Sequence, residues 1–219
     1  MKIIITKPDL FAAALKLMST DDLRRGIKGV CLQPRPEGGC YLVATDGHSF
    51  FAGVDVEAAG VDKEYIIRPL SNPSLASLAK AMALEISDTL ITPYRAGGKH
   101  ASMPFKIVDG TFLDWRRFVP DCSSGVVSDF NAEYVATFGA ASKLLECETM
   151  KIFHNGFAPC LVKGQRDDWF GILMPLRVNP YEIPVTFGYP AAFNIPAPVK
   201  KVEDVRQAAV KMYGPRAEA

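Results

Sequence analysis

The feature that most constrains this sequence is a pattern that occurs three times along the chain. Each time, a stretch with the apolar spacing of a helix is followed by several short stretches typical of β-strands. The helical stretches lie at residues 8–18, 72–82 and 131–145. They recur roughly every 60 residues, which predicts an internal repeat of secondary-structure elements rather than of the amino-acid sequence itself. We therefore expect an α+β fold made of about three related units.

The strands and turns complete each unit. Asp46-Gly47 and Asn155-Gly156 stand between apolar runs and predict hairpin turns, because glycine adopts a positive φ without a steric clash. Residues 121–128 are rich in serine and resemble a linker, and the proline-rich residues after 177 precede a last predicted helix at 202–212. The predicted strands are residues 2–6, 29–32, 40–43, 50–54, 64–68, 84–87, 90–94, 101–108, 150–154, 157–162 and 169–173.

Composition excludes several classes of protein. Hydrophobic residues make up 48% of the chain and charged residues 22%, with a net charge of +1, so no strong field indicates nucleic acid, a membrane or an acidic substrate. The five cysteines include no CxxC pair, which argues against zinc and a disulfide framework and favours reduced thiols in the cytoplasm. Residues 1–6 are too short for a signal peptide, and no run is long enough to span a membrane. We expect no metal and no cofactor.

Two histidines raise the question of catalysis. His48 follows Asp46, but no serine elbow, metal-ligand spacing or phosphate loop accompanies it. His154 and Cys160 flank the Asn155-Gly156 turn and could form a thiol nucleophile, although a buried strand cysteine is far commoner. We therefore expect a protein that is not an enzyme, with catalysis by Cys160 or His48 as a rival hypothesis.

The stretch from Phe112 to Pro120 combines aromatic and basic residues. Arg116 and Arg117 have two interpretations: a solvated basic pair whose stems pack on Trp115, or guanidinium groups beside a groove that binds a peptide. Three further lysines each fall on one predicted helix. They are typical of solvated surface but could make diffuse contacts with DNA phosphates; these lysines are Lys16, Lys80 and Lys143.

Four motifs, in this order, carry a resemblance to the bacterial DNA polymerase III β sliding clamps. They are Ala44-Thr45-Asp46-Gly47-His48, Phe112-Leu113-Asp114-Trp115-Arg116-Arg117-Phe118-Val119-Pro120, Phe130-Asn131-Ala132-Glu133-Tyr134-Val135 and Leu173-Met174-Pro175-Leu176-Arg177. The clamp motifs read ATDGHR, PDYRR with a following proline, FN..Y and MP(M)R. The resemblance covers roughly residues 8–178 and implies a clamp fold of βαβββ half-units, two to a domain, with helices lining a DNA hole.

The resemblance also implies a domain organisation. Residues 1–120 resemble the middle clamp domain, residues 121–178 the second half of the last domain, and residues 179–219 form a tail. One and a half clamp domains indicate a shortened clamp of the kind a phage or prophage would encode. The unpaired third half-unit would expose a sheet edge. A second copy of the chain could cover that edge, which we prefer, or the tail could do so.

The retained parts are those that line the peptide groove of the family, which binds short linear motifs of DNA polymerases and other replication and repair proteins. Apolar walls would accept leucine and phenylalanine anchors, and polar side chains would orient the peptide. Ser49, Leu113 and Phe118 depart from the family pattern. The groove residues implied by motif position are Arg24, Ile27, Thr45, Gly47, His48, Ser49, Phe50, Leu113, Arg117, Phe118, Asn131, Tyr134, Ala158, Cys160, Ile172, Leu173, Met174, Pro175, Leu176 and Arg177.

We therefore expect a DNA replication processivity factor of the sliding-clamp type, without enzymatic activity, that forms a homo-oligomer and could encircle double-stranded DNA. The main alternative keeps the groove without the ring. Such a protein would be an adaptor or decoy that competes for clamp-binding peptides, and the near-neutral charge of the chain favours it slightly.

Overall fold

The computed structural model describes residues 1–20 and 25–176. Residues Met1–Arg177 form one compact unit. Several expectations lie outside the described residues: the positions of Arg24 and Arg177, the tail at 179–219 and the helix at 202–212. The predicted domain boundary at residue 120 lies within the compact unit and stays a prediction.

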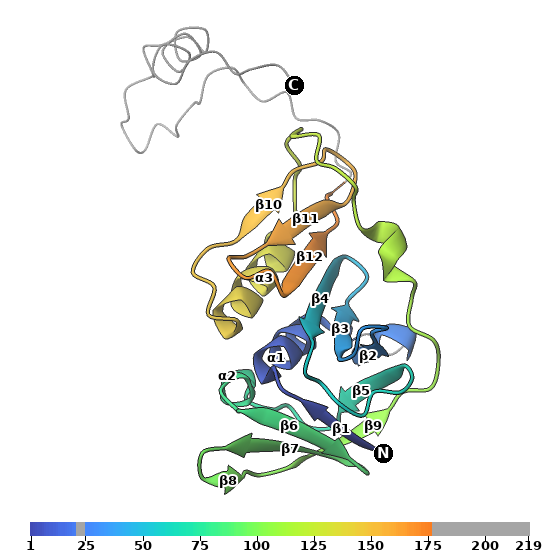
Figure 1. Ribbon diagram of the computed structural model, residues 1–219. Coiled ribbons are helices and arrows are strands. Elements are labelled where there is room, and N and C mark those ends of the chain that lie inside the picture. The colour runs from blue at the N-terminus through green and yellow to red at the C-terminus, as the bar shows by residue number, and fades with distance from the viewer. Residues whose placement is uncertain (21–24, 177–219) are drawn as a thin grey trace, which may run out of the picture. The chain divides into compact units, whose positions relative to one another are not determined.

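The described residues contain three α-helices, two 3₁₀ turns and twelve strands (Figure 1). The helices are α1 Pro8–Leu17, α2 Leu75–Ala79 and α3 Ala132–Leu144, and the 3₁₀ turns are η1 Arg25–Ile27 and η2 Trp115–Phe118. The strands are β1 Lys2–Ile5, β2 Val30–Pro34, β3 Cys40–Thr45, β4 Ser49–Asp55, β5 Tyr65–Pro69, β6 Ala83–Ser87, β7 Leu90–Arg95, β8 Gly98–Lys99, β9 Met103–Ile107, β10 Lys151–Phe153, β11 Cys160–Lys163 and β12 Trp169–Leu173.

The element order confirms the α+β fold built from βαβββ half-units. The first half-unit is β1-α1-β2-β3-β4 and the second is β5-α2-β6-β7-β9, with the short β8 added to β7. The third is α3-β10-β11-β12, and no strand precedes α3 between residues 108 and 131. The third half-unit is therefore incomplete in the part of the chain that the structure describes.

The first two half-units exchange their leading strands. The order across the sheet is β1-β6-β7-β9-β5-β2-β3-β4-β12-β11-β10, so β1 pairs with β6 of the second half-unit and β5 pairs with β2 of the first. Strands β2, β6 and β10 are equivalent, because each is the first strand after its helix. Within the described residues, β10 pairs with β11 alone and receives no leading strand.

The opposite edge of the sheet is covered. Ile4 of β1 exchanges both backbone hydrogen bonds with Ala59, at N···O distances of 2.9 and 3.0 Å. The next residue, Gly60, has a φ of +81°, and a Cβ there would lie 2.1 Å from the Lys2 carbonyl oxygen. Glycine is therefore required for this close approach, and the loop after β4 occupies part of the outer side of β1.

Helices cover one face of the sheet, where the main core lies. Helix α1 lies between α2 and α3 (Figure 1), and nearly all its side chains are buried. From α3, Phe138 is fully buried against Gly171 of β12, where a Cβ would lie 2.2 Å from the phenylalanine ring. At this contact the third half-unit packs closely on the rest of the sheet, because the two surfaces are complementary in shape.

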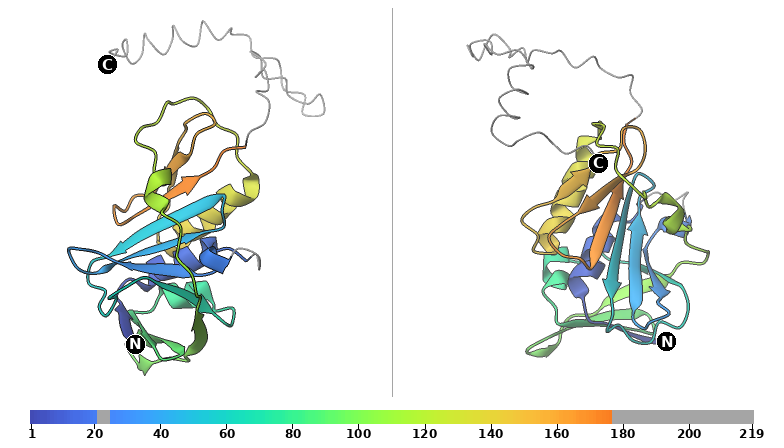
Figure 2. Two further views of the ribbon diagram at one scale, coloured as in Figure 1. Left: turned by 90° about the vertical axis from the view of Figure 1, so that its right-hand side faces the viewer. Right: turned by 45° about the horizontal axis from the view of Figure 1, so that its top comes forward.

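The connecting segment, residues 108–119, crosses the other face of the sheet, as the left view of Figure 2 shows in yellow-green. Trp115 is buried there and stacks on Phe50 at a centroid distance of 5.4 Å. Tyr41 and Phe170 complete this aromatic cluster, with ring centroids 5.9 and 6.0 Å from that of Trp115. The connecting segment therefore has a small apolar core of its own, separate from the core under the helices.

Two expectations for local structure were wrong. The second helix ends at Ala79 rather than reaching residue 82, because the backbone N–H of Met82 donates to the Tyr94 carbonyl and leads the chain into β6. The Asn155-Gly156 pair lies in a loop of residues 154–159, not in a tight hairpin turn. Residues 123–128 take the hydrogen bonds of this loop, for example from Gly156 N to the Val126 carbonyl at 2.8 Å.

Candidate functional site

The turn between β3 and β4 is fixed by its own side chains. Asp46 Oδ1 accepts hydrogen bonds from the N–H groups of His48 and Ser49, at 2.8 and 2.6 Å. Thr45 Oγ1 donates to the Ser49 carbonyl and accepts from Gly47 N, and Gly47 has a φ of +97°. This Asx-type turn confirms the predicted hairpin. It holds His48 and Phe50 in place without help from a ligand.

Next to this turn lies a groove of about 140 Å³ that three separate stretches of the chain form together. Its walls come from the β3–β4 hairpin, from the connecting segment and from the end of β12. Among residues 1–20 and 25–176, all the residues that line it belong to the set implied by motif position, and none of them carries an acidic, lysine or arginine side chain. The lining residues are Thr45, Gly47, His48, Ser49, Phe50, Leu113, Phe118, Ile172 and Met174.

Helix α3 extends the site at its rim. Asn131 caps the helix by accepting a hydrogen bond from Glu133 N at 2.9 Å, and this cap fixes the first turn. Tyr134 in that turn stacks on His48, with ring centroids 5.2 Å apart and an interplanar angle of 12°. The His48 carbonyl also accepts from Met174 N at 2.9 Å. The hairpin, α3 and the end of β12 therefore meet at one point.

The structure places other predicted site residues away from the groove. Leu173 is fully buried in the core under the helices, because neighbouring residues of a strand point to opposite faces and Ile172 takes the groove side. Cys160, paired with Leu173, is also fully buried. Ala158 lies in the exposed β10–β11 loop. We correct the expectation that these three residues line the groove.

The remaining predicted residues surround the groove more loosely. Ile27 packs against the apolar core that contains Trp115. Arg117 is largely exposed and pairs with Asp114 at 2.8 Å. Pro175 and Leu176 follow Met174, and Leu176 N donates to the Asp129 carbonyl at 2.8 Å. None of these four residues forms the groove wall.

Two residues behind the groove, Glu64 and Gln33, were not predicted. Glu64 accepts hydrogen bonds from Phe112 N at 2.7 Å and from the Gln33 side-chain amide at 2.8 Å. The Gln33 carbonyl oxygen in turn accepts from Trp115 Nε1 at 2.9 Å. No motif links these residues, because they come from β2, the loop before β5 and the connecting segment.

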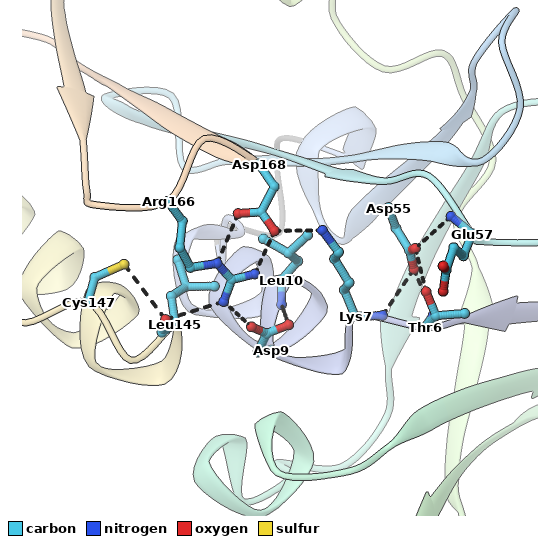
Figure 3. Close-up of polar contacts among 10 residues, drawn as sticks. All are labelled: Thr6, Lys7, Asp9, Leu10, Asp55, Glu57, Leu145, Cys147, Arg166 and Asp168. Carbon is cyan, nitrogen blue, oxygen red and sulfur yellow. Dashed lines mark hydrogen bonds and ion pairs between the residues drawn. The ribbon is translucent and has the colours of Figure 1, made fainter.

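An ionic network lies at the opposite end of β12 from the groove (Figure 3). Arg166 contacts both oxygens of Asp168, with Nε···Oδ1 2.9 Å and Nη2···Oδ2 2.6 Å, and it also pairs with Asp9 at the start of α1. It donates further to the Leu145 carbonyl at the end of α3, and Lys7 Nζ lies 2.8 Å from Asp168 Oδ2. Burial alone would raise the pKa of Asp168, but these hydrogen bonds outweigh burial and lower it.

The cysteine and histidine that could form a thiol nucleophile each contact Ser128 instead of each other. The Cys160 thiol is buried beside Ser128 Oγ, at 3.3 Å. His154 Nδ1 accepts from Ser128 N at 3.1 Å and so is already used in holding the loop. Burial raises the pKa of the Cys31 thiol strongly and that of Cys40 to about 12, so neither is a thiolate at neutral pH.

The charges and metal-binding groups elsewhere are unremarkable. Lys16, Lys80 and Lys143 are exposed, on or next to the three helices. In residues 1–20 and 25–176, no group of histidine, cysteine and acidic residues is arranged to hold a metal ion. Across the same residues, no helix has the length and apolar character needed to cross a bilayer.

The half-units, the exchanged strands and the single layer of helices define the fold of the DNA sliding clamps. Among solved structures, the chain is similar to the DnaN sliding clamp of Bartonella birtlesii bound to griselimycin, with 17% identity and a TM-score of 0.57 over 81% of this chain and 66% of that one. It is also similar to DNA polymerase III subunit beta of Borrelia burgdorferi, in complex with a natural product (11%, TM-score 0.59, 82% and 63%), and of Pseudomonas aeruginosa (17%, 0.58, 81% and 67%).

The chain thus spans about two thirds of the length of these clamps. The sequence matches no protein-family model and no curated protein. At these identities the similarity establishes the fold, and the role of the groove needs its own evidence.

Proposed function

We propose that this protein is a sliding-clamp-like replication factor that binds short linear motifs of DNA polymerases or repair proteins in the groove. The observation that carries the proposal is the convergence of the β3–β4 hairpin, the connecting segment and the end of β12 on one groove whose lining, within the described part of the chain, contains no acidic, lysine or arginine side chain. The chain is proposed to act by binding and not by catalysis, because Cys160 is buried and His154 Nδ1 already accepts a hydrogen bond from Ser128 N.

The shape and chemistry of the groove suit apolar anchor residues. At about 140 Å³ it has room for one or two side chains and not for a folded surface. Phe50 offers an apolar floor, Leu113 and Ile172 offer apolar walls, and Met174 adapts to different partners because its side chain is unbranched and polarizable. Leucine and phenylalanine side chains of an extended peptide would fill such a site.

The test is a titration with a fluorescein-labelled peptide that carries one leucine and one phenylalanine anchor, called here the anchor peptide. Met174→Ala and Phe118→Ala should each weaken binding about tenfold, because each removes part of the groove wall. Phe157→Ala is the matched control, since Phe157 is as exposed as Phe118 but lies outside the groove. Equal affinity of all four proteins for the anchor peptide would refute the proposed site.

Assembly on DNA is the second part of the proposal. Strand β10 is equivalent to β2 and β6, both of which pair with a leading strand, so a second copy of the chain could add there about a two-fold axis. Lys16, Lys80 and Lys143 would then face DNA phosphates. If the protein forms a ring, light scattering should show a dimer or a larger species. The protein should also be retained on closed circular DNA and should be lost from it when the circle is cut.

One observation favours the alternative of an adaptor without a ring. The β1 edge is already bridged by Ala59, so strand addition is open at the β10 end alone within the described residues. Two copies joined at β10 would therefore leave two covered ends and form an open arc. A monomer or an open dimer that binds the anchor peptide but is not retained on circular DNA would select this alternative.

A further inference from the structure

We propose that Glu64 and Gln33 act as positioning residues for the groove, through a chain of hydrogen bonds called here the Glu64–Gln33–Trp115 relay. The inference rests on the proposed function of the groove. Neither Glu64 nor Gln33 lines the groove. They act through the connecting segment, which supplies Leu113 and Phe118 to the groove wall.

The relay runs in one direction. Trp115 Nε1–H can only donate, and the Glu64 carboxylate can only accept. Gln33 therefore has one orientation that satisfies both: its carbonyl oxygen faces Trp115 at 2.9 Å, and its NH₂ group faces Glu64 at 2.8 Å. The second oxygen of Glu64 accepts from Phe112 N at 2.7 Å. One carboxylate thus fixes both ends of the segment 112–115.

The two fixed points lie on either side of a wall residue. Phe112 and Trp115 are both buried, whereas Leu113 between them faces the groove. Trp115 also stacks on Phe50, which forms part of the groove floor, at 5.4 Å. Phe118 belongs to the same 3₁₀ turn as Trp115. A shift of the Trp115 ring would therefore move both wall residues of the connecting segment and the floor together.

If Glu64 and Gln33 served only to fill space, each could be replaced by a side chain of the same shape. The hydrogen bonds of the relay would be lost in such a replacement. In Glu64→Gln, the amide at position 64 has one oxygen and one NH₂ group. If its oxygen accepts from Phe112 N, its NH₂ group forces Gln33 to turn, and two donors then meet at Trp115 Nε1. If the amide takes the other orientation, two donors meet at Phe112. In Gln33→Glu, two carboxylates face each other instead.

The double variant Glu64→Gln with Gln33→Glu restores every pairing. The amide at position 64 accepts from Phe112 N and donates to the new carboxylate, whose other oxygen accepts from Trp115 Nε1. The side-chain sizes and the total charge are those of the natural protein. Rescue by this exchange is therefore a test that a merely space-filling role would not pass.

The experiment measures two quantities on the full-length chain: affinity for the anchor peptide, and the indole N–H resonance of Trp115, assigned by its loss in Trp115→Phe. Each single variant should weaken binding about fivefold and shift the resonance, because Glu64→Gln leaves a buried donor without its acceptor and Gln33→Glu sets two carboxylates against each other. The double variant should return both to the natural values. Glu85→Gln is a control, since Glu85 accepts from Tyr94 far from the groove.

The outcomes separate the inference from the proposed function. If the natural protein binds the anchor peptide and both single variants bind equally well, the relay does not position the groove, while the proposed function stands. A double variant no better than the singles would also overturn the inference. If the natural protein does not bind the anchor peptide, the proposed function fails. In that case, an indole resonance that is unchanged in both single variants overturns the relay as well.

Discussion

The paired strands β4 and β12, called here the seam, end in two opposite environments. At one end, Phe50 faces Ile172 beside a groove whose described lining residues include no acidic, lysine or arginine side chain. At the other end, where Asp168 precedes β12, two basic and two acidic side chains form the ionic network of Figure 3. The charges that hold the third half-unit in register are thus kept away from the groove, whose walls stay apolar. Stability and binding can therefore be changed separately.

The largest expected effect comes from the middle of the seam. Gly171→Ala places a Cβ against the Phe138 ring, at 2.2 Å before relaxation, and should lower the free energy of unfolding by about 3 kcal/mol. Gly97→Ala is the control, because a Cβ there meets no atom within 4 Å. Denaturant titration of both variants measures the difference. Equal stability of the two would mean that α3 does not pack on β12 in this way.

The ionic network at one end of the seam should contribute less to stability than the contact between Gly171 and Phe138. Arg166→Met leaves Asp9 and Asp168 with one basic partner fewer, and we expect a loss of about 2 kcal/mol, because the group is only partly buried. Lys163→Met is the control, since its pair with Asp167 is long, at 3.8 Å, and exposed. Affinity for the anchor peptide should change little at temperatures where the variant is folded. A loss of affinity larger than that of Met174→Ala would show that the two ends are coupled.

Low pH should weaken the ionic network at this end of the seam. The pKa of Asp168 is lowered in the folded chain, so its contribution is complete above the ordinary aspartate pKa and is lost as the pH falls through the lower folded value. We expect stability to decrease by about 1 kcal/mol from this group below pH ~4. In Asp168→Asn that part of the pH dependence disappears. An unchanged acid profile in this variant, measured by thermal unfolding, would contradict the role assigned to Asp168.

The smallest effect is expected at the groove end. The stacked rings of His48 and Tyr134 should couple by about 0.5 kcal/mol. A double-mutant cycle with His48→Ala and Tyr134→Ala measures this energy. A coupling energy of zero would indicate that α3 and the hairpin are held together by the seam alone.

The sequence predicted the elements well where local pattern decides. The strand Trp169–Leu173 has the predicted bounds, and Asn131 begins the third helix as a capping residue should. The expected groove residues were implied by the resemblance to sliding clamps, and nine of them do line one groove. Strand alternation could have excluded Leu173 at once, because it follows Ile172.

Other features depend on contacts between distant residues. Helix α2 is short because Met82 pairs with Tyr94, and the Asn155-Gly156 loop is wide because residues 123–128 bind it. The Glu64–Gln33–Trp115 relay joins residues up to 82 positions apart in the sequence. A single sequence gives no sign of such pairs, since nothing in the local pattern of either residue names its distant partner.

The order of the groove elements along the chain has a consequence for biosynthesis. Residues 45–50 leave the ribosome early, residues 113–118 follow, and the last wall, Ile172 and Met174, is made after all of the others. A nascent chain that ends before residue 172 can pair β3 with β4 but has no groove. Pairing of such distant residues is slow compared with local folding. Partners that use the groove would therefore meet only chains whose synthesis has passed residue 174.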